Sequence, residues 1–176
     1  MNRKTHIAIL ITAAALMARA DDSAQRTGAN PPDAVVKQGS LQCSEKLLTT
    51  AYSFEKAKAA SKKREADIIF YFDDDDCSQG ALFGQDDRKG FIFPVGKRSW
   101  DEVSLRDLPR EDTESVVGFR PITKNKEGLA FWVKTKGERY VLVRIKSVQP
   151  ASYAELTSGK TAKVDFEWAW GVPGGE

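Results

Sequence analysis

Six aspartates in one short region are the residues whose type and spacing come closest to a site for chemistry. Asp73 to Asp76 form an unbroken run, and Asp86 and Asp87 follow a short distance along the chain. Calcium takes about six to eight oxygen ligands, so a fold that brought the two groups together would offer suitable carboxylates. The candidate ligands of such a site are Asp74, Asp76, Asp86 and Asp87.

The spacing of the aspartate run does not match a calcium-binding loop. In an EF-hand frame that starts at Asp73, Cys77 stands where an oxygen ligand is needed and Ser78 where glycine is needed. Neighbouring residues of a strand also point to opposite faces, so adjacent aspartates do not converge. We therefore expect a solvated turn whose charge discourages strand pairing. Calcium binding and docking of a basic partner stay open as alternatives.

Most enzyme and metal chemistry lacks its residues in this chain. Histidine occurs once, at His6, in a segment that we expect to be removed. Without histidine there is no Ser-His-Asp or Cys-His catalytic set and no histidine-based zinc or iron site. The phosphate-binding motifs GxxxxGK[ST] and GxGxxG are both absent from the sequence. We expect a protein that is not an enzyme and needs no cofactor.

The first residues have the three-part layout of a secretory signal peptide. Arg3 and Lys4 form a basic start, residues 7–17 are apolar, and Ala18-Arg19-Ala20 is an A-x-A cleavage pattern. The apolar run is well short of the ~20 residues that span a bilayer, so we expect no transmembrane segment. The sequence predicts cleavage of residues 1–20 and export to the periplasm or out of the cell.

Removal of residues 1–20 would leave 156 residues with 24 basic and 25 acidic side chains. A nearly neutral chain lacks the broad basic field of nucleic-acid-binding proteins, so we expect no nucleic-acid partner. Residues 21–40 are polar, include Pro31 and Pro32, and show no apolar periodicity, which predicts a flexible leader. Residues 41–172 are then expected to form a single domain, long enough to bury a core.

Two cysteines, Cys43 and Cys77, stand in the predicted domain. In an exported protein an even number of cysteines usually indicates a disulfide bond. A bridge between them would close a loop of about 35 residues, which is expected to stabilise the fold by roughly 3–4 kcal/mol. Two buried free thiols are the alternative.

Apolar, β-branched and aromatic residues dominate the domain in short runs separated by polar turns, a pattern typical of strands. The predicted strands cover residues 49–54, 66–72, 91–95, 129–135, 139–148 and 162–170, and residues 100–108 are expected to hold a short helical turn. The turn at residues 136–138 contains a glycine and predicts a hairpin. The fold class is therefore all-β: an antiparallel β-sandwich or a partly open barrel, with at most one or two short helices.

The segment from Val133 to Tyr140, "VKTKGERY", precedes an alternating strand and a last aromatic strand at residues 164–170. This arrangement resembles the HmuY-type haem-binding proteins, a group of secreted bacterial β-rich modules. The resemblance implies the all-β fold. It does not imply haem binding here, because those proteins hold the iron through two histidines and the predicted mature chain has none.

The four tryptophans offer the remaining candidate site. Trp132 and Trp168 would stack a ligand such as a saccharide if they were exposed, whereas a buried aromatic residue belongs to the core. We expect an exported, non-catalytic interaction or structural module of the cell envelope. A small-ligand or carbohydrate-binding module that uses exposed aromatic residues is the alternative, and burial of the two tryptophans would favour the first.

Overall fold

The protein is an all-β sandwich of two antiparallel five-stranded sheets, which confirms the predicted fold class. The computed structural model describes residues 35–72, 82–84, 91–103, 107–110 and 112–171. Within these residues the two sheets do not join into a closed barrel. The only α-helix of the described residues is α1 (Tyr153–Thr157), and short 3-10 turns make up the remaining helical structure.

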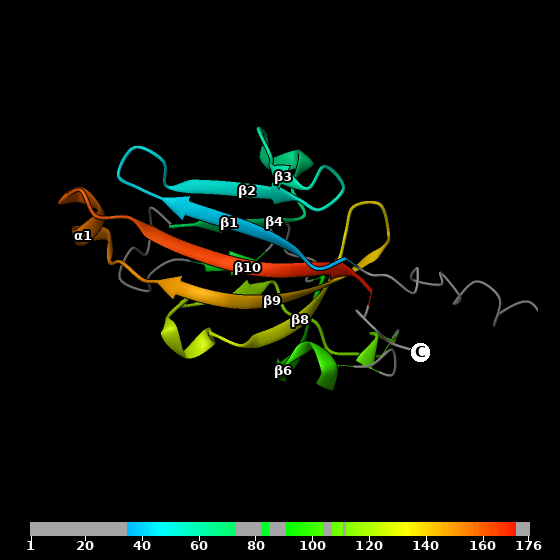
Figure 1. Cartoon of the computed structure of the whole chain (residues 1–176). Coiled ribbons are helices and arrows are strands. Elements are labelled where there is room, and N and C mark those ends of the chain that lie inside the picture. Colours follow the sequence, from blue (N-terminus) through cyan, green and yellow to red (C-terminus); the bar gives the residue numbers. More distant parts are fainter. Residues whose placement is uncertain (1–34, 73–81, 85–90, 104–106, 111, 172–176) are drawn as a thin grey trace, which may run out of the picture.

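The first sheet has the strand order β1-β10-β9-β8-β6 and lies at the front of Figure 1. Its members are β1 (Lys37–Cys43), β6 (Ile92–Lys97), β8 (Leu129–Lys134), β9 (Tyr140–Gln149) and β10 (Ala162–Trp170). The hairpin expected at residues 136–138 is present, since β8 pairs with β9 around that turn. The edge strands β1 and β6 come before the three central strands in the sequence.

The second sheet has the order β3-β2-β4-β5-β7. Its members are β2 (Thr49–Ser53), β3 (Lys58–Ala59), β4 (Ile68–Tyr71), β5 (Leu82–Gly84) and β7 (Gly118–Phe119). Three 3-10 turns lie in the described connections: η1 (Lys63–Glu65), η3 (Trp100–Glu102) and η5 (Lys124–Lys126). The turn η3 falls in the segment where the sequence predicts one.

The main hydrophobic core fills the space between the sheets, and β10 shows why the sequence builds it. Val164, Phe166 and Trp168 alternate along β10 and are fully buried. Alternation with a period of two puts all three on the inner face of the strand. Phe166 and Trp168 contact Tyr52 of β2 edge to face, with ring centroids 5.2 and 6.2 Å away. The indole N–H of Trp168 donates to the Tyr52 hydroxyl at 3.2 Å.

A second, smaller core covers part of the outer face of the first sheet. It contains Phe93, Val103, Ala130, Trp132 and Leu142, which are all at least nine-tenths buried. The segment around η3 covers this face, and half-buried Trp100 and Leu108 pack against it. The strands β8 and β9 are therefore buried on both faces, and not on one face only.

One end of the sandwich is held together by a buried carboxylate. Asp67, just before β4, is 4% exposed and accepts the backbone N–H of Phe54 at 2.8 Å and that of Lys136 at 3.2 Å. Phe54 follows β2 in the second sheet, and Lys136 lies in the β8–β9 turn of the first. The single side chain of Asp67 thus ties the hairpin turn to the opposite sheet.

The sequence predicted β2, β4, β6, β8, β9 and β10, and missed β1 and the three shortest strands. Strand β1 begins at Lys37, so residues 37–40 belong to a strand and not to the leader that the sequence predicts. The strands β3, β5 and β7 have two or three residues each, too few to give a periodic pattern. Helix α1 was also missed, although Ser152 and Glu155 form a capping box, which is typical of a helix start.

Candidate binding face on the first sheet

The two tryptophans expected to stack a ligand are fully buried. Trp168 lies in the main core and Trp132 in the second core, each with 0% exposure. Trp132 points away from the main core, as its place in the strand predicts, but the segment around η3 covers it. Neither ring is exposed to solvent, so the structure gives no support to ligand stacking on these two residues.

The candidate calcium ligands Asp74, Asp76, Asp86 and Asp87 lie outside the described residues, as does the whole run from Asp73 to Asp76. Within the part of the chain that the structure describes, no group of three or more histidine, cysteine or acidic residues could hold a metal ion. The solvated-turn interpretation of the aspartates stays a prediction. No helix among the described residues is long and apolar enough to cross a membrane.

Cys43 is a buried free thiol at the end of β1. Its Sγ donates to the carbonyl oxygen of Phe70 at 3.3 Å, and burial raises the pKa of the thiol to about 11. The expected bridge partner, Cys77, lies outside the described residues. The described residues contain no disulfide bond, and the bridge to Cys77 stays a prediction.

Thiol titration of the denatured exported protein without reductant decides the state of the cysteines. We expect no free thiol, because both cysteines would be oxidised to one bridge. The same titration after reduction should find two thiols and serves as the control. Two thiols before reduction would leave Cys43 as the buried free thiol that the structure describes.

A β-bulge creates the most distinctive polar feature of the first sheet. Asp165 pairs with Ser147 but the next residue of β10, Phe166, pairs with Ile145, so Lys146 is the extra residue of β9. Ile145 and Val148 are buried in the core, and Lys146 and Ser147 between them both lie toward solvent. A bulge re-aims side chains in this way and is common next to binding sites.

The re-aimed residues face polar residues of β1 across β10. A shallow groove of about 660 Å³ runs over these strands. Its lining residues are Gln38, Gly39, Ser40, Lys146, Ser147, Asp165 and Phe166. We call this surface, together with Lys163 beside it, the bulge face. Its strands β1, β10 and β9 lie at the front of the molecule in Figure 1.

Gly39 leaves room for the aromatic ring of Phe166, its partner in the β1–β10 pair. A Cβ atom at this position would stand 2.4 Å from the ring of Phe166, far inside van der Waals contact. The fully buried ring of Phe166 therefore fills the place of a side chain beneath β1. Gly39 is required here for space, and the surface above it stays shallow.

Asp165 is the fixed polar centre of the bulge face. Its carboxylate accepts from the Ser147 hydroxyl at 3.0 Å and pairs with the Lys163 ammonium at 2.9 Å, and Ser40 also bonds to it. Burial by itself would raise the pKa of Asp165, but the hydrogen bonds from Lys163, Ser40 and Ser147 together lower it below its ordinary value. The carboxylate is therefore charged and held in one orientation.

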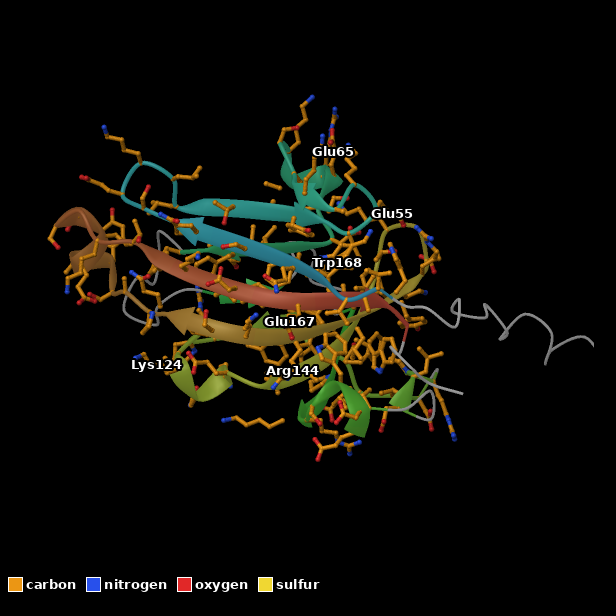
Figure 2. All side chains as sticks on the ribbon, viewed as in Figure 1. Glu55, Glu65, Lys124, Arg144, Glu167 and Trp168 are labelled. Atoms are coloured by element: carbon orange, nitrogen blue, oxygen red, sulfur yellow. The ribbon has the colours of Figure 1, made fainter. Side chains whose placement is uncertain are left out.

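Glu167 forms a second anchored carboxylate next to the bulge face. Trp100 donates its indole N–H to Glu167 at 3.0 Å, and Lys146 and Arg144 pair with the same carboxylate at 3.2 and 3.6 Å. The hydrogen bond from Trp100 is the main cause that lowers the pKa of Glu167, and the pairing with Lys146 adds to it. Figure 2 shows Glu167 and Arg144 near each other on the outer side of the sheet.

The charge state of Asp165 leads to a pH prediction. Folding lowers the pKa of the Asp165 carboxyl below its ordinary value of 3.8. The ionised carboxylate therefore stabilises the fold fully above pH 3.8, and this stabilisation is lost as the pH falls through the pKa of the folded state. We expect Asp165→Asn to cost about 1 kcal/mol at neutral pH and to lose less stability on acidification below about pH 4 than the unchanged protein.

Urea unfolding of both proteins at a series of pH values measures this difference. Asp112→Asn, on an exposed turn, is the matched control and should follow the unchanged protein at every pH. Parallel pH curves for Asp165→Asn and the unchanged protein would show that the Asp165 carboxylate is not held as described.

Comparison with known proteins gives no family for this chain: no protein-family model and no curated protein matches it. The resemblance to HmuY-type proteins therefore stays a prediction, and the function is inferred from the geometry of the bulge face.

The sequence predicted part of the bulge face and missed the rest. It predicted the strand at residues 162–170 that carries Lys163, Asp165 and Glu167, but it assigned Gln38 and Ser40 to the leader. One signal of the bulge was available: Ile145 and Val148 are three residues apart, which breaks the apolar period of two.

Proposed function

We propose that this protein is an exported, non-catalytic interaction module of the cell envelope that binds a macromolecular partner through the bulge face. One observation carries the proposal: the bulge brings Lys146 and Ser147 to the outer surface beside Ser40 and the anchored Asp165. A strand pair without the bulge would turn one of these two side chains toward the core.

The chemistry of the bulge face supports recognition of a polar surface. Exposed Gln38 and Lys146 supply donors and an amide oxygen, and Asp165 supplies a charged acceptor. Because Asp165 is fixed by its own hydrogen bonds, little side-chain entropy is lost when a partner binds to it. A shallow polar surface with fixed groups suits the rim of a protein interface.

The same hydrogen bonds argue against catalysis at this face. One oxygen of Asp165 accepts from Ser147 and the other pairs with Lys163, and both partners donate to the carboxylate. A general base must instead activate a nucleophile or a water molecule, usually with a pKa near neutrality. A carboxylate whose pKa is lowered fits that role poorly.

A small polar ligand such as a saccharide is the second candidate, because Gln38, Ser40 and Asp165 present polar groups along the same shallow groove. Such a ligand would have to bind by hydrogen bonds to the bulge face, because Trp132 and Trp168 are buried.

Photo-cross-linking in the cells that make the protein tests the proposal. A photoreactive amino acid replaces Gln38 in the full chain, and an otherwise identical chain carries it at Lys124, which is exposed at the far end of the sandwich in Figure 2. We expect a discrete adduct with an envelope component from position 38 only. Lys146→Glu should weaken that adduct by reversing a charge on the same face.

Three results would overturn the proposed function. Equal adducts from positions 38 and 124 would mean random contact, and no adduct from position 38 would mean that the bulge face is free in the cell. Recovery of the protein with residues 1–20 still attached would contradict export, whatever the cross-linking shows.

A further inference from the structure

The structure gathers a strongly basic surface at one end of an otherwise acidic molecule. Residues 55–67 and 134–139 are far apart in the sequence and together contain eight basic and four acidic residues, a net charge of +4. The rest of the predicted mature chain therefore carries about −5. We call these two segments the basic end. The near-neutral total charge hides it.

Three contacts hold the two segments of the basic end together. The ammonium of Lys136 donates to the Arg64 carbonyl oxygen at 2.6 Å, and the backbone N–H of Lys136 donates to buried Asp67. Arg139 pairs with Glu55. Figure 1 shows the β8–β9 turn beside β3 and η1, at the end of the sandwich opposite to α1.

Several cations at the basic end form no salt bridge to a carboxylate of the described residues. The hydrogen bond from Lys56 lowers the pKa of Glu65, and Lys58 and Arg64 lie near enough to add to this shift. Lys56, Lys134 and Arg139 each pair with an acidic neighbour. A second set of exposed cations forms no salt bridge to a carboxylate of the described residues. Its members are Lys58, Lys62, Arg64 and Lys136. In Figure 2, nitrogen-tipped side chains project outward around Glu65. This second set is available to an anionic partner.

The basic end can contact a partner with many anions at several points. Its cations stand on separate exposed turns: residues 55–58, the turn around Lys62 and Arg64, and residues 136–139. Alanine is the only apolar residue type in the two segments, so no large apolar side chain shields the lysine stems. A flat array of anionic headgroups can contact several of these turns at the same time.

Two exposed apolar residues next to the basic end favour a lipid surface over a soluble polyanion. Val35 and Val36 are 70% and 40% exposed and precede β1. Lys37, the next residue, lies over the Trp168 ring, and Arg139 lies over the neighbouring ring of Trp170. The valines therefore stand close to the basic end, where a membrane interface would cover them and a soluble polyanion would not.

We propose that the basic end adsorbs the protein on the surface of an anionic phospholipid bilayer, as a peripheral contact without insertion of a helix. This proposal uses a surface other than the bulge face and goes beyond the proposed function. A protein held by its basic end would leave the bulge face, on the side of the sandwich, accessible to a partner.

Binding of the predicted mature chain to vesicles tests the proposal. The probes are vesicles of phosphatidylcholine alone and of phosphatidylcholine mixed with phosphatidylglycerol, with binding measured by co-sedimentation. We expect binding to the mixed vesicles only, with a steep loss as salt is raised toward physiological strength and beyond. Neutralising one cation at such a surface reduces binding by about fivefold.

The triple variant Lys58→Gln/Lys62→Gln/Lys136→Gln should therefore lose binding by on the order of a hundredfold. The matched control is Lys46→Gln/Lys124→Gln/Lys160→Gln, which changes the total charge equally at the opposite end of the sandwich. Its binding should stay near that of the unchanged protein. Val35→Ser/Val36→Ser should weaken vesicle binding at high salt, where the apolar contact remains.

Three outcomes would overturn the proposal. Absence of binding to the anionic vesicles would do so, and so would equal losses in the two triple variants. A protein that bound soluble polyphosphate through the basic end but did not bind the vesicles would have a surface for a soluble polyanion instead. Cross-linking from position 38 does not depend on any of these results, so failure of this proposal and failure of the proposed function are distinguishable.

Discussion

Trp168→Ala is expected to destabilise the protein by about 3–5 kcal/mol. Trp168 is fully buried, contacts Phe54 with ring centroids 5.1 Å apart, and bonds to the Tyr52 hydroxyl. Truncation would remove a large apolar side chain, open a cavity between the sheets and leave the Tyr52 hydroxyl without its indole donor.

Urea unfolding measures this loss, and Trp168→Phe is the matched control. Phenylalanine keeps an aromatic ring in the core but removes the N–H donor, so its cost should be well below that of alanine. A loss of less than about 1 kcal/mol for Trp168→Ala would contradict the core position and would reopen a surface role for this tryptophan.

Asp67→Ala is expected to cost about 3 kcal/mol because it leaves one buried and one part-buried backbone N–H group without their acceptor. These are the N–H groups of Phe54 and Lys136, which lie on opposite sheets. Asp67→Asn keeps one oxygen and should cost roughly half as much. Glu55→Gln, which breaks only the exposed pair with Arg139, should cost less than about 1 kcal/mol.

Amide hydrogen exchange separates this role of Asp67 from a general loss of stability. The Lys136 amide should exchange much faster in Asp67→Ala, while exchange in the middle of β9 should accelerate only in proportion to the global loss of stability. Unchanged protection at Lys136 would mean that Asp67 does not hold the hairpin turn. The same variant should also loosen the basic end, because Lys136 joins its two segments.

Strands with a clear alternation of apolar and polar residues were predictable because one physical rule produces them. In β10 the alternation of Val164, Phe166 and Trp168 with polar residues follows directly from a strand with one buried face. The same rule could not predict the exposure of Trp132. Alternation gives the face of the sheet on which a residue lies, but not whether another segment covers that face. The segment that covers Trp132 belongs to an irregular connection, for which no periodic signal exists.

The sites depend on contacts between segments that are distant in the sequence. Ser40 and Asp165 are more than a hundred residues apart and meet because β1 pairs with β10. Asp67 and Lys136 meet because the hairpin turn of one sheet closes over the other. Neither pairing leaves a local pattern, so composition and spacing alone could not bring these segments together. Only the bulge in β9 left a signal, in the three-residue spacing of Ile145 and Val148.

The central claim is that the tryptophans serve the core, so that any small ligand must bind at the bulge face and not on their rings. Titration of the isotopically labelled protein with a panel of neutral and acidic saccharides, followed by NMR, tests it most directly. We expect the indole N–H signals of Trp132 and Trp168 to stay unchanged with every saccharide, and any shifts to fall on backbone amides near Ser40, Lys146 and Asp165. Contacts between saccharide protons and the ring of Trp132 or Trp168 would contradict the claim.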